Sequence, residues 1–426
     1  MILVNFLPIV LFVFIYVGSG IYFSLIGIHN AFYQISPTVA IIPAIALAWL
    51  LQRGTTQQKM RNFLDGVRHP DIITMCIIFL LAGAFSSVTH AIGSVDSTVN
   101  LALSLISPEF LLIGLFITAA FISIAIGTSL GTIATVAPIA HGLAIQGAFS
   151  PIIGMATVVG GAMFGDNLSI ISDTTIAAVM SQEADMKSKL KINAIVAFFA
   201  SIITITLLFF IHDNTATIGF NNYSLVLVAP YIILITLALL GINVFTVLVF
   251  SIACAGVIGY FHQGYTPFAL SNDMVKGFAS MHEIMLLSLM VGGLSGLAGK
   301  STKELALHVS QWISKVGGKK KTAQLVIAAI VSVFDVLLAN NTIAIVVSGE
   351  VARDIAQRYE IPPHYSAAWL DIFSCVFQGL IPYGAQVLLA SSIAGISPLS
   401  IIPHVYYCYA LAAVSIVYIV TKRKLV

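Results

Sequence analysis

The chain has 426 residues, of which 59% are hydrophobic and only 8% are charged, and its formal net charge is +2. Soluble globular chains carry roughly 25% charged residues, so this composition excludes an ordinary water-soluble domain and favours a surface that faces lipid. The sequence contains no phosphate-binding loop, nucleophile elbow or zinc motif, which disfavours ATP-driven transport and hydrolysis. We therefore expect no enzymatic activity, no nucleic-acid partner and no bound cofactor.

The first apolar stretch lacks the basic region and the small-residue cleavage site of a signal peptide, so it is interpreted as a helix of the protein. A helix needs about 20 apolar residues to cross the hydrocarbon layer. In chain order, the sequence predicts membrane-spanning helices at residues 2–26, 36–51, 72–92, 150–181, 191–211, 224–240, 242–260, 283–299, 365–392 and 401–420.

Two further apolar segments are interrupted near their middle. Segment 110–143 is broken by the run Gly127-Thr128-Ser129-Leu130-Gly131-Thr132, and segment 323–351 is broken at Asn340-Asn341. The apolar arm after each break has roughly 9 to 12 residues, which is too short to cross the membrane. Irregular backbone at this depth is tolerated where it is buried in protein or lines a wet cavity, so both segments are predicted to be re-entrant hairpins.

The distribution of basic residues predicts the orientation of the chain. With a cytoplasmic N-terminus and with each hairpin returning to its own side, 18 of the 19 basic residues fall on the cytoplasmic side and only Lys276 does not. These predictions place the protein in a bacterial cytoplasmic (inner) membrane as a multi-pass protein with both termini in the cytoplasm. The 18 residues are Arg53, Lys59, Arg61, Arg68, Lys187, Lys189, Lys191, Lys300, Lys303, Lys315, Lys319, Lys320, Lys321, Arg353, Arg358, Lys422, Arg423 and Lys424.

The two hairpins occupy corresponding places in the two halves. Each is followed by a span with a polar centre, at residues 165–175 in the first half and 378–386 in the second. Paired hairpins and broken helices of opposite orientation predict an all-α polytopic fold with an inverted-topology repeat. The predicted parts are an N-terminal half (1–181), connecting scaffold helices (182–282) and a C-terminal half (283–426). We expect a solute site near the midplane, where the four breaks meet, and a homodimer within the lipid bilayer.

Four carboxylates lie inside apolar segments, where a charge costs about 2.5–3.5 kcal/mol on insertion scales. They are Asp166, Asp173, Asp335 and Asp371. Carboxylate, hydroxyl and carbonyl oxygens suit a hard cation such as Na⁺, and the same carboxylate can bind a proton instead. The alternative is that Asp166 and Asp173 only cap half-helices. Asp335 and Asp371 are possible proton- or ion-coupling residues. The alternatives are that Asp335 pairs with a cytoplasmic-side lysine instead of facing the cavity, and that Asp371 lies at the membrane interface.

Small polar side chains surround these carboxylates in the sequence. Helix N-termini at the hairpin tips favour anions and C-termini favour cations, so the tips could serve either kind of ligand or form turns only. The remaining candidate ion-binding or solute-binding residues are Asn167, Ser169, Ser172 and Thr174 at the first broken span, Thr128, Ser129, Asn340, Asn341 and Thr342 at the tips, and Gln378, Tyr383 and Gln386 at the second broken span.

Two motifs of the first half resemble the NhaC-type Na⁺/H⁺ antiporter family of the ion-transporter superfamily. GTSLGTIATVAPIA at 127–140 is similar to the glycine-threonine hairpin of that family, and GDNLSIISDTTIAA at 165–178 is similar to its signature with two aspartates. The resemblance implies a cation/proton exchanger with an inverted repeat, usually a homodimer. Thr128, Asp166, Ser169, Ser172, Asp173 and Thr174 fall on the matching positions, and Asn340-Asn341-Thr342 resembles a sodium-binding tip.

The leading hypothesis is secondary active Na⁺/H⁺ antiport by alternating access, with Na⁺ and H⁺ binding in turn at Asp166 and Asp173. The alternative is a Na⁺- or H⁺-coupled carrier of a small organic solute such as an amino acid or a carboxylate. The run Pro382-Tyr383-Gly384-Ala385-Gln386 resembles relatives that include organic-solute carriers, which is the basis of that alternative. A third reading is a channel or a structural membrane subunit.

Overall fold

The computed structural model describes residues 7–26, 34–105, 107–170, 172–211, 223–315 and 320–422. Every regular element in this part of the chain is a helix. The helices are α1 (Leu7–Leu25), α2 (Pro37–Leu51), α3 (Thr56–Val67), α4 (Pro70–Ala91), α5 (Ser94–Leu105), α6 (Pro108–Ile126), α7 (Ser129–Ile145), α8 (Pro151–Leu168), α9 (Asp173–Gln182), α10 (Met186–Phe210), α11 (Leu225–Leu239), α12 (Val244–Gln263), α13 (Pro267–Lys315), α14 (Lys320–Leu338), α15 (Asn341–Arg358), α16 (Pro363–Gln378), α17 (Ala385–Ala394), α18 (Pro398–Ile401), a 3₁₀ turn (Ile402–His404) and α19 (Tyr406–Thr421).

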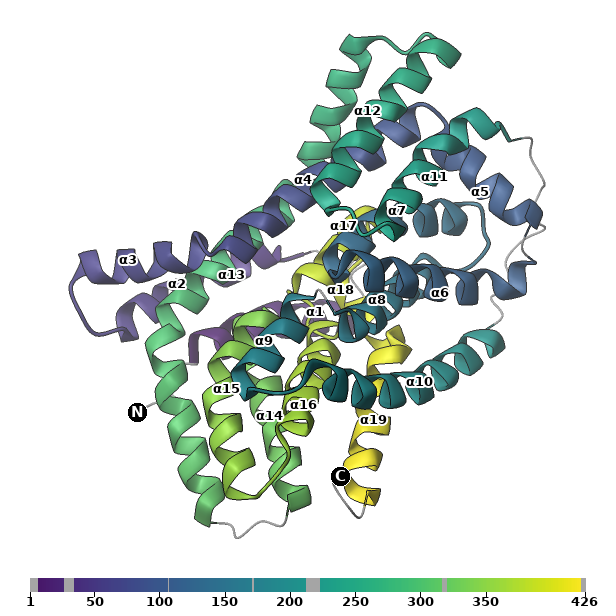
Figure 1. Ribbon diagram of the computed structural model, residues 1–426. Coiled ribbons are helices and arrows are strands. Elements are labelled where there is room, and N and C mark those ends of the chain that lie inside the picture. The colour runs from purple at the N-terminus through teal and green to yellow at the C-terminus, as the bar shows by residue number, and fades with distance from the viewer. Residues whose placement is uncertain are drawn as a thin grey trace.

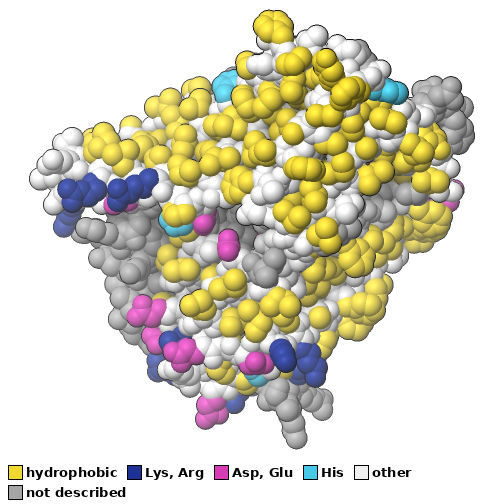
Figure 2. Space-filling model, turned by 45° about the horizontal axis from the view of Figure 1, so that its top comes forward, with side chains coloured by type: hydrophobic (Ala, Val, Ile, Leu, Met, Phe, Trp, Pro, Cys, Tyr) yellow, Lys and Arg dark blue, Asp and Glu magenta, His cyan; other side chains and the backbone are white. Residues whose placement is uncertain are grey.

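Six helices of the described chain are long and apolar enough to cross a membrane. They are Pro70–Ala91, Glu109–Ile126, Met186–Phe210, Val244–His262, Pro267–Leu297 and Lys320–Leu338, and α17 with the segment Pro398–His404 forms a bent pair that gives a seventh. Figure 2 shows hydrophobic side chains over most of one face, with Lys and Arg gathered at its margins. A surface of this kind needs an apolar solvent, so the protein is a multi-pass helical membrane protein.

Several predicted boundaries differ from the structure. The predicted spans 36–51, 224–240 and 401–420 correspond to α2, α11 and α19, which are apolar but shorter than 18 residues. The predicted span 283–299 is part of α13, which begins 16 residues earlier at Pro267. The prediction missed these first residues because polar side chains near the start of α13 lower the local hydropathy. Residues 2–6 of the first predicted span and Lys319, Arg423 and Lys424 lie outside the described residues.

Local sequence explains where the helices begin. Seven of the helices in the described part of the chain start at a proline, at residues 37, 70, 108, 151, 267, 363 and 398. Proline suits this position because the first helical N–H has no partner within the helix and the fixed φ of proline is already helical. The amphipathic helix α3, which the sequence did not predict, begins with a capping box between Thr55 and Gln58.

Helix α13 packs unusually closely against α3 and α4, which lie along it in Figure 1. A Cβ atom on Gly66 of α3 would come within 2.0 Å of the Gly292 carbonyl oxygen on α13. A Cβ on Gly277 of α13 would come within 2.3 Å of the Gly83 carbonyl oxygen on α4. Small residues let helix backbones approach in lipid, where packing and hydrogen bonds replace the hydrophobic effect as the cause of helix association.

The two predicted hairpin tips have the same backbone form. Gly127, with φ +76°, ends α6, and Thr128, with φ −148°, precedes α7. Ala339, with φ +50°, follows α14, and Asn340, with φ −149°, precedes α15. The arms after the tips are longer than predicted, at 17 residues in α7 and 18 in α15. Helix α7 already begins inside the predicted break, at Ser129, and α15 continues beyond its apolar stretch into polar residues that end at Arg358.

The two broken helices exchange their second arms between the halves. The first broken helix consists of α8 and α9, and α9 packs against α15 and α16 of the second half. The second broken helix consists of α16 and α17, and α17 packs against α7 and α8 of the first half (Figure 1). This exchange brings the two helix breaks and the two tips toward one centre.

A buried polar centre at four helix breaks

Eight helix ends surround the centre. The helices α6, α8, α14 and α16 end at the tips and breaks, and α7, α9, α15 and α17 begin there. Helix N-termini carry unpaired N–H groups and partial positive charge, whereas C-termini carry unpaired carbonyls and partial negative charge. The centre therefore offers polar backbone groups of both kinds together with buried polar side chains.

Asp166 is the carboxylate at the middle of this centre. It lies in the last turn of α8, its residue is 4% exposed, and it accepts hydrogen bonds from Ser129 Oγ at 2.9 Å and Ser172 Oγ at 2.5 Å. The hydroxyl of Ser172 also lies 2.8 Å from that of Thr174. Two hydroxyl donors stabilise the ionised carboxylate, and each hydroxyl retains oxygen lone pairs that could face a cation.

A chain of hydrogen bonds joins Asp166 to the other tip. Gln386 Nε2 donates to Ser129 Oγ at 3.2 Å, and Gln378 Nε2 donates to Gln386 Oε1 at 2.6 Å. The same Gln378 nitrogen lies 3.4 Å from the Ala339 carbonyl oxygen. The structure thus brings together both tips and both broken helices, and Gln378 and Gln386 are the side chains that connect the two halves.

A second buried network lies beside the first. Lys189 of α10 and Asp371 of α16 form an ion pair between fully buried side chains, and Lys189 Nζ also donates to Thr175 Oγ1 at 2.8 Å. Asn193 Nδ2 donates to Asp371 Oδ2 at 2.8 Å and to Asn167 Oδ1 at 2.8 Å. Because Asn167 follows Asp166 in α8, this network connects directly to the first.

The sequence did not predict this network. The Asp371 side chain is completely buried in the ion pair. Lys189 follows the start of α10 at Met186, and its side chain is buried rather than exposed to solvent. The signal that could have found Lys189 is its spacing of four residues from Asn193, which places both polar side chains on one helix face.

Asp173 lies at the edge of the centre rather than inside it. It is the first residue of α9 and its side chain is exposed, and its charged neighbour is Asp71 of α4, which the sequence did not single out. Asp71 Oδ2 accepts a hydrogen bond from Asn340 Nδ2 at 3.2 Å and lies 3.6 Å from His69 Nδ1. Asp71 is therefore bonded to the second tip and is a like-charged neighbour of Asp173.

Several of the remaining candidates hydrogen-bond to the backbone. Ser169 Oγ donates to the Ile124 carbonyl at 2.8 Å, and Tyr383 Oη donates to the Val336 carbonyl at 2.7 Å. At the second tip, Asn340 Oδ1 caps α15 by accepting from the Ile343 N–H, and Asn341 Oδ1 accepts from the Thr342 N–H. Thr128 precedes α7 without a side-chain capping bond. Turn and cap chemistry accounts for most of the second tip.

Asp335 differs from the other three carboxylates. It lies in α14 one turn before Ala339 and has no exposed surface. It approaches the backbone amide of Gln378, yet neither of its oxygens accepts a hydrogen bond of normal geometry from the described residues. The sequence allowed a salt bridge to a lysine at this position, and no ion pair of Asp335 is formed in the described part of the chain.

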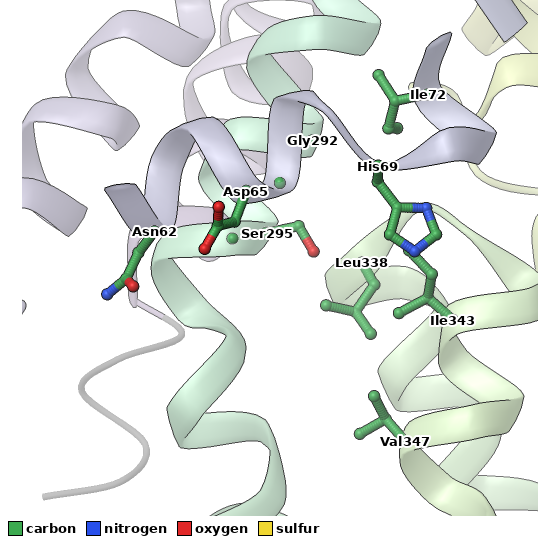
Figure 3. A pocket seen from close by; sticks show the side chains of 11 residues that line it. Asn62, Asp65, His69, Ile72, Gly292, Ser295, Leu338, Ile343 and Val347 are labelled. Carbon is green, nitrogen blue, oxygen red and sulfur yellow. The ribbon is translucent and has the colours of Figure 1, made fainter. Parts of the chain in front are cut away.

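A pocket opens beside the second tip. Figure 3 shows Leu338 and Ile343, which flank the tip, facing a cavity that His69, Asp65 and Ser295 line from the opposite side. Its volume is about 290 Å³, and its walls come from α3, α4, α13, α14 and α15. The cavity gives the second tip a partly open side.

The chemistry of the centre favours a small hard cation. Asp166, Ser129, Ser172 and Thr174 supply only oxygen atoms, which is the ligand type preferred by group-one cations over thiol or imidazole sites. No group of three His, Cys, Asp or Glu side chains within the described ranges is arranged to hold a metal ion. Together the fold and this centre define a multi-pass membrane protein with a buried oxygen-lined site between two tips and two broken helices.

Comparison with known proteins agrees with that class. Residues 70–212 match the model of the Na⁺/H⁺ antiporter family, and this range includes the first tip, Asp166, Asp173 and Lys189. The Na⁺/H⁺ antiporter NhaC of Bacillus subtilis is 24% identical over 84% of this chain and 85% of its own length. The resemblance to the NhaC-type Na⁺/H⁺ antiporters is confirmed.

Two further proteins are similar over most of their length. The malate-2H⁺/Na⁺-lactate antiporter of Bacillus subtilis is 21% identical over 94% of this chain and 92% of its own length. The solved structure of the Alcanivorax borkumensis YdaH transporter aligns with 14% identity and a TM-score of 0.43 over 97% of each chain. The similar curated proteins are antiporters, in agreement with a transport protein rather than an enzyme.

Proposed function

We propose that the protein is a Na⁺/H⁺ antiporter in which Asp166 holds the transported Na⁺. The observation that carries this proposal is the arrangement of Asp166 with the hydroxyls of Ser129 and Ser172 at the junction of the four helix breaks. The relation to NhaC supports the transported ions, because that relative is a Na⁺/H⁺ antiporter. Na⁺ and H⁺ are here the transported species and not resident cofactors.

The exchange follows from the electrostatics of one buried carboxylate. Bound Na⁺ stabilises the ionised form of Asp166, and the two hydroxyls turn their lone pairs toward the cation. When Na⁺ leaves, burial favours the protonated carboxyl over an uncompensated charge. The site is neutral when it holds either ion and charged when it is empty. The protein therefore changes the side to which the site is open most easily when an ion is bound.

The proposal includes an inverted-topology repeat with two re-entrant hairpins. Three observations support it: the matching backbone of the tips at Gly127-Thr128 and Ala339-Asn340, the broken helix after each hairpin, and the exchange of α9 and α17 between the halves. In this arrangement the hairpins rock against a scaffold of the remaining helices and expose Asp166 to each side in turn. We further propose a homodimer in the bacterial cytoplasmic membrane with both termini in the cytoplasm.

Organic-solute transport is the second candidate, favoured by the relation to the malate-2H⁺/Na⁺-lactate antiporter. The side chains that the sequence assigned to solute binding are engaged elsewhere. Gln378 and Gln386 bond to each other, Tyr383 bonds to the Val336 carbonyl, and the cavity of about 290 Å³ is lined by other residues. These contacts favour ion exchange over carboxylate transport.

Everted membrane vesicles test the proposal. We expect Na⁺ added to vesicles with an acidic interior to dissipate the pH gradient, and malate or lactate without Na⁺ to leave it unchanged. Vesicles containing the Asp166→Asn variant, at equal membrane abundance, serve as the control. A wild-type protein that responds only when malate or lactate is present would replace this function by the second candidate.

A further inference from the structure

One face of α10 holds both arms of the first broken helix. Lys189 and Asn193 are four residues apart in this unbroken helix, so their side chains leave the same face about one turn apart. Asn193 Nδ2 donates to the Asn167 carbonyl oxygen at 3.0 Å, at the end of α8. Lys189 Nζ donates to Thr175 Oγ1 at 2.8 Å, in the first turn of α9. One turn of α10 therefore fixes how far apart the two arms lie.

A carboxylate of α16 holds this face of α10 in place. Lys189 Nζ and Asn193 Nδ2 both donate to the same oxygen of Asp371, Oδ2. These three side chains are completely buried, and so is Thr175. A buried polar group that loses its partner has no water to replace it, so such contacts are broken only at a high cost in free energy. Lys189, Asn193 and Asp371 thus form a rigid unit, which we call the α10 clamp.

The proposed Na⁺ site takes its oxygens from both of these arms. Asp166 precedes Asn167 in the last turn of α8, whereas Ser172 and Thr174 lie at the start of α9. The Ser172 hydroxyl is 2.5 Å from Asp166 Oδ1 and 2.8 Å from the Thr174 hydroxyl. The space between these oxygens depends on the separation of α8 and α9, which is the distance that the α10 clamp fixes.

The start of α9 depends on the α10 clamp more than the end of α8 does. Near the end of α8, Ser169 Oγ also donates to the Ile124 carbonyl oxygen of α6 at 2.8 Å. Along α9, the next side-chain hydrogen bond to another helix is that of Gln182 Nε2 to the Gly349 carbonyl oxygen, at the opposite end of α9. Loss of the contact between Lys189 and Thr175 would therefore free the part of α9 that carries the site oxygens.

A cation site discriminates by size when its oxygens cannot move apart. Selection between hard cations depends on the size of the cavity, the number of ligands and the rigidity of the site. K⁺ is larger than Na⁺, so an oxygen cage that is kept narrow favours Na⁺. A cage whose two sides can separate accepts K⁺ as well.

We propose that Lys189, Asn193 and Thr175 are positioning residues that keep the oxygen cage at Asp166 narrow and so select Na⁺ over K⁺. They act through the positions of α8 and α9 and not by binding the ion. The inference rests on the proposed Na⁺ site at Asp166, and it adds the residues that determine which group-one cation this site accepts.

Thermal stabilisation of the purified protein by Na⁺ and by K⁺, at constant ionic strength, tests the inference. The measured quantity is the ratio of the K⁺ and Na⁺ concentrations that give half of the full stabilisation. Asn193→Leu and Thr175→Val each remove one contact with little change in volume. We expect both to weaken Na⁺ binding by about 10-fold, as changes behind metal ligands do, and K⁺ binding much less, so that the ratio falls. Thr175→Ser keeps the hydroxyl and should keep the wild-type ratio.

A buried threonine outside the α10 clamp provides the matched control. Thr204 of α10 donates its hydroxyl to the Ala200 carbonyl oxygen of the same helix at 2.8 Å. Thr204→Val should leave the ratio unchanged, whatever it does to the melting temperature. Thr175→Val keeps the test usable if Asn193→Leu does not fold, because it leaves the ion pair intact.

The outcomes separate the inference from the proposed function. Wild-type ratios in Asn193→Leu and Thr175→Val, even with lower melting temperatures, would overturn the inference and leave Na⁺ binding at Asp166 standing. A wild type that Na⁺ and K⁺ stabilise equally would also overturn it, since the site would then select neither ion. Stabilisation by Na⁺ that persists in Asp166→Asn, or is absent in the wild type, would remove the proposed site at Asp166 and the inference with it.

Discussion

The ion pair between Lys189 and Asp371 gives a quantitative prediction about stability. Both side chains are fully buried, and removing one partner of such a pair costs about 3–5 kcal/mol because the other charge is left uncompensated. In Lys189→Met, Asp371 Oδ2 would keep the Asn193 donor at 2.8 Å and the weaker Thr175 contact at 3.5 Å. These remaining donors place the expected loss at the lower end, at about 3 kcal/mol.

The assay is unfolding in mixed micelles by titration with a denaturing detergent, followed by tryptophan fluorescence. The double variant Lys189→Met/Asp371→Leu replaces the pair by apolar groups and should recover most of the loss, since such replacements are often neutral. The exposed pair of Arg353 with Glu183 is the matched control, and Glu183→Gln should cost at most about 1 kcal/mol. A cost of Lys189→Met no larger than that of the control would refute the buried charge pair.

Three further predictions concern the site and the helix packing. Asp166→Asn should abolish Na⁺/H⁺ exchange with the fold retained, because this carboxylate is buried at the centre. Asp173→Asn, at the exposed edge, should lower the apparent Na⁺ affinity without abolishing exchange. An equal loss of exchange in both variants would contradict their different positions. Gly277→Ala should destabilise the protein by about 1–3 kcal/mol through the overpacked contact with Gly83, whereas Gly18→Ala, with open space around it, should be neutral in the same unfolding assay. Ala339→Val should lower the free energy of unfolding by about 1–2 kcal/mol, because the left-handed backbone at this position strains a branched side chain. Ala339→Gly should cause no such loss, and a comparison of the melting temperatures of the two variants tests the difference.

The sequence was most informative about features that depend on local patterns. Apolar length, the glycine of the first tip and the asparagines of the second located the breaks that the structure contains. The buried role of Asp166 was also predictable, because a carboxylate in an apolar segment needs polar neighbours and the same stretch supplies Ser172 and Thr174.

Other features depend on contacts between distant segments and were not predictable from local patterns. Lys189 looks like one of several loop lysines until the fold places Asp371, 182 residues further along the chain, beside it. Asp173 and Asp166 have similar sequence surroundings, and only the direction of α9 places one outside and the other inside. The start of α13 was missed because polar residues such as Asp273 and Lys276 lower the hydropathy of its first turns, although the segment Pro267–Leu297 is long and apolar enough to cross a membrane.

The central claim is that Asp166 holds the Na⁺ that exchanges for protons. Reconstituted proteoliposomes that report ²²Na⁺ uptake and internal pH in the same sample test it most directly. The account predicts that an outward proton gradient drives Na⁺ uptake together with internal alkalinisation in the wild type, and that both signals disappear in Asp166→Asn. Coupled Na⁺ uptake and alkalinisation at wild-type rates in Asp166→Asn would contradict it.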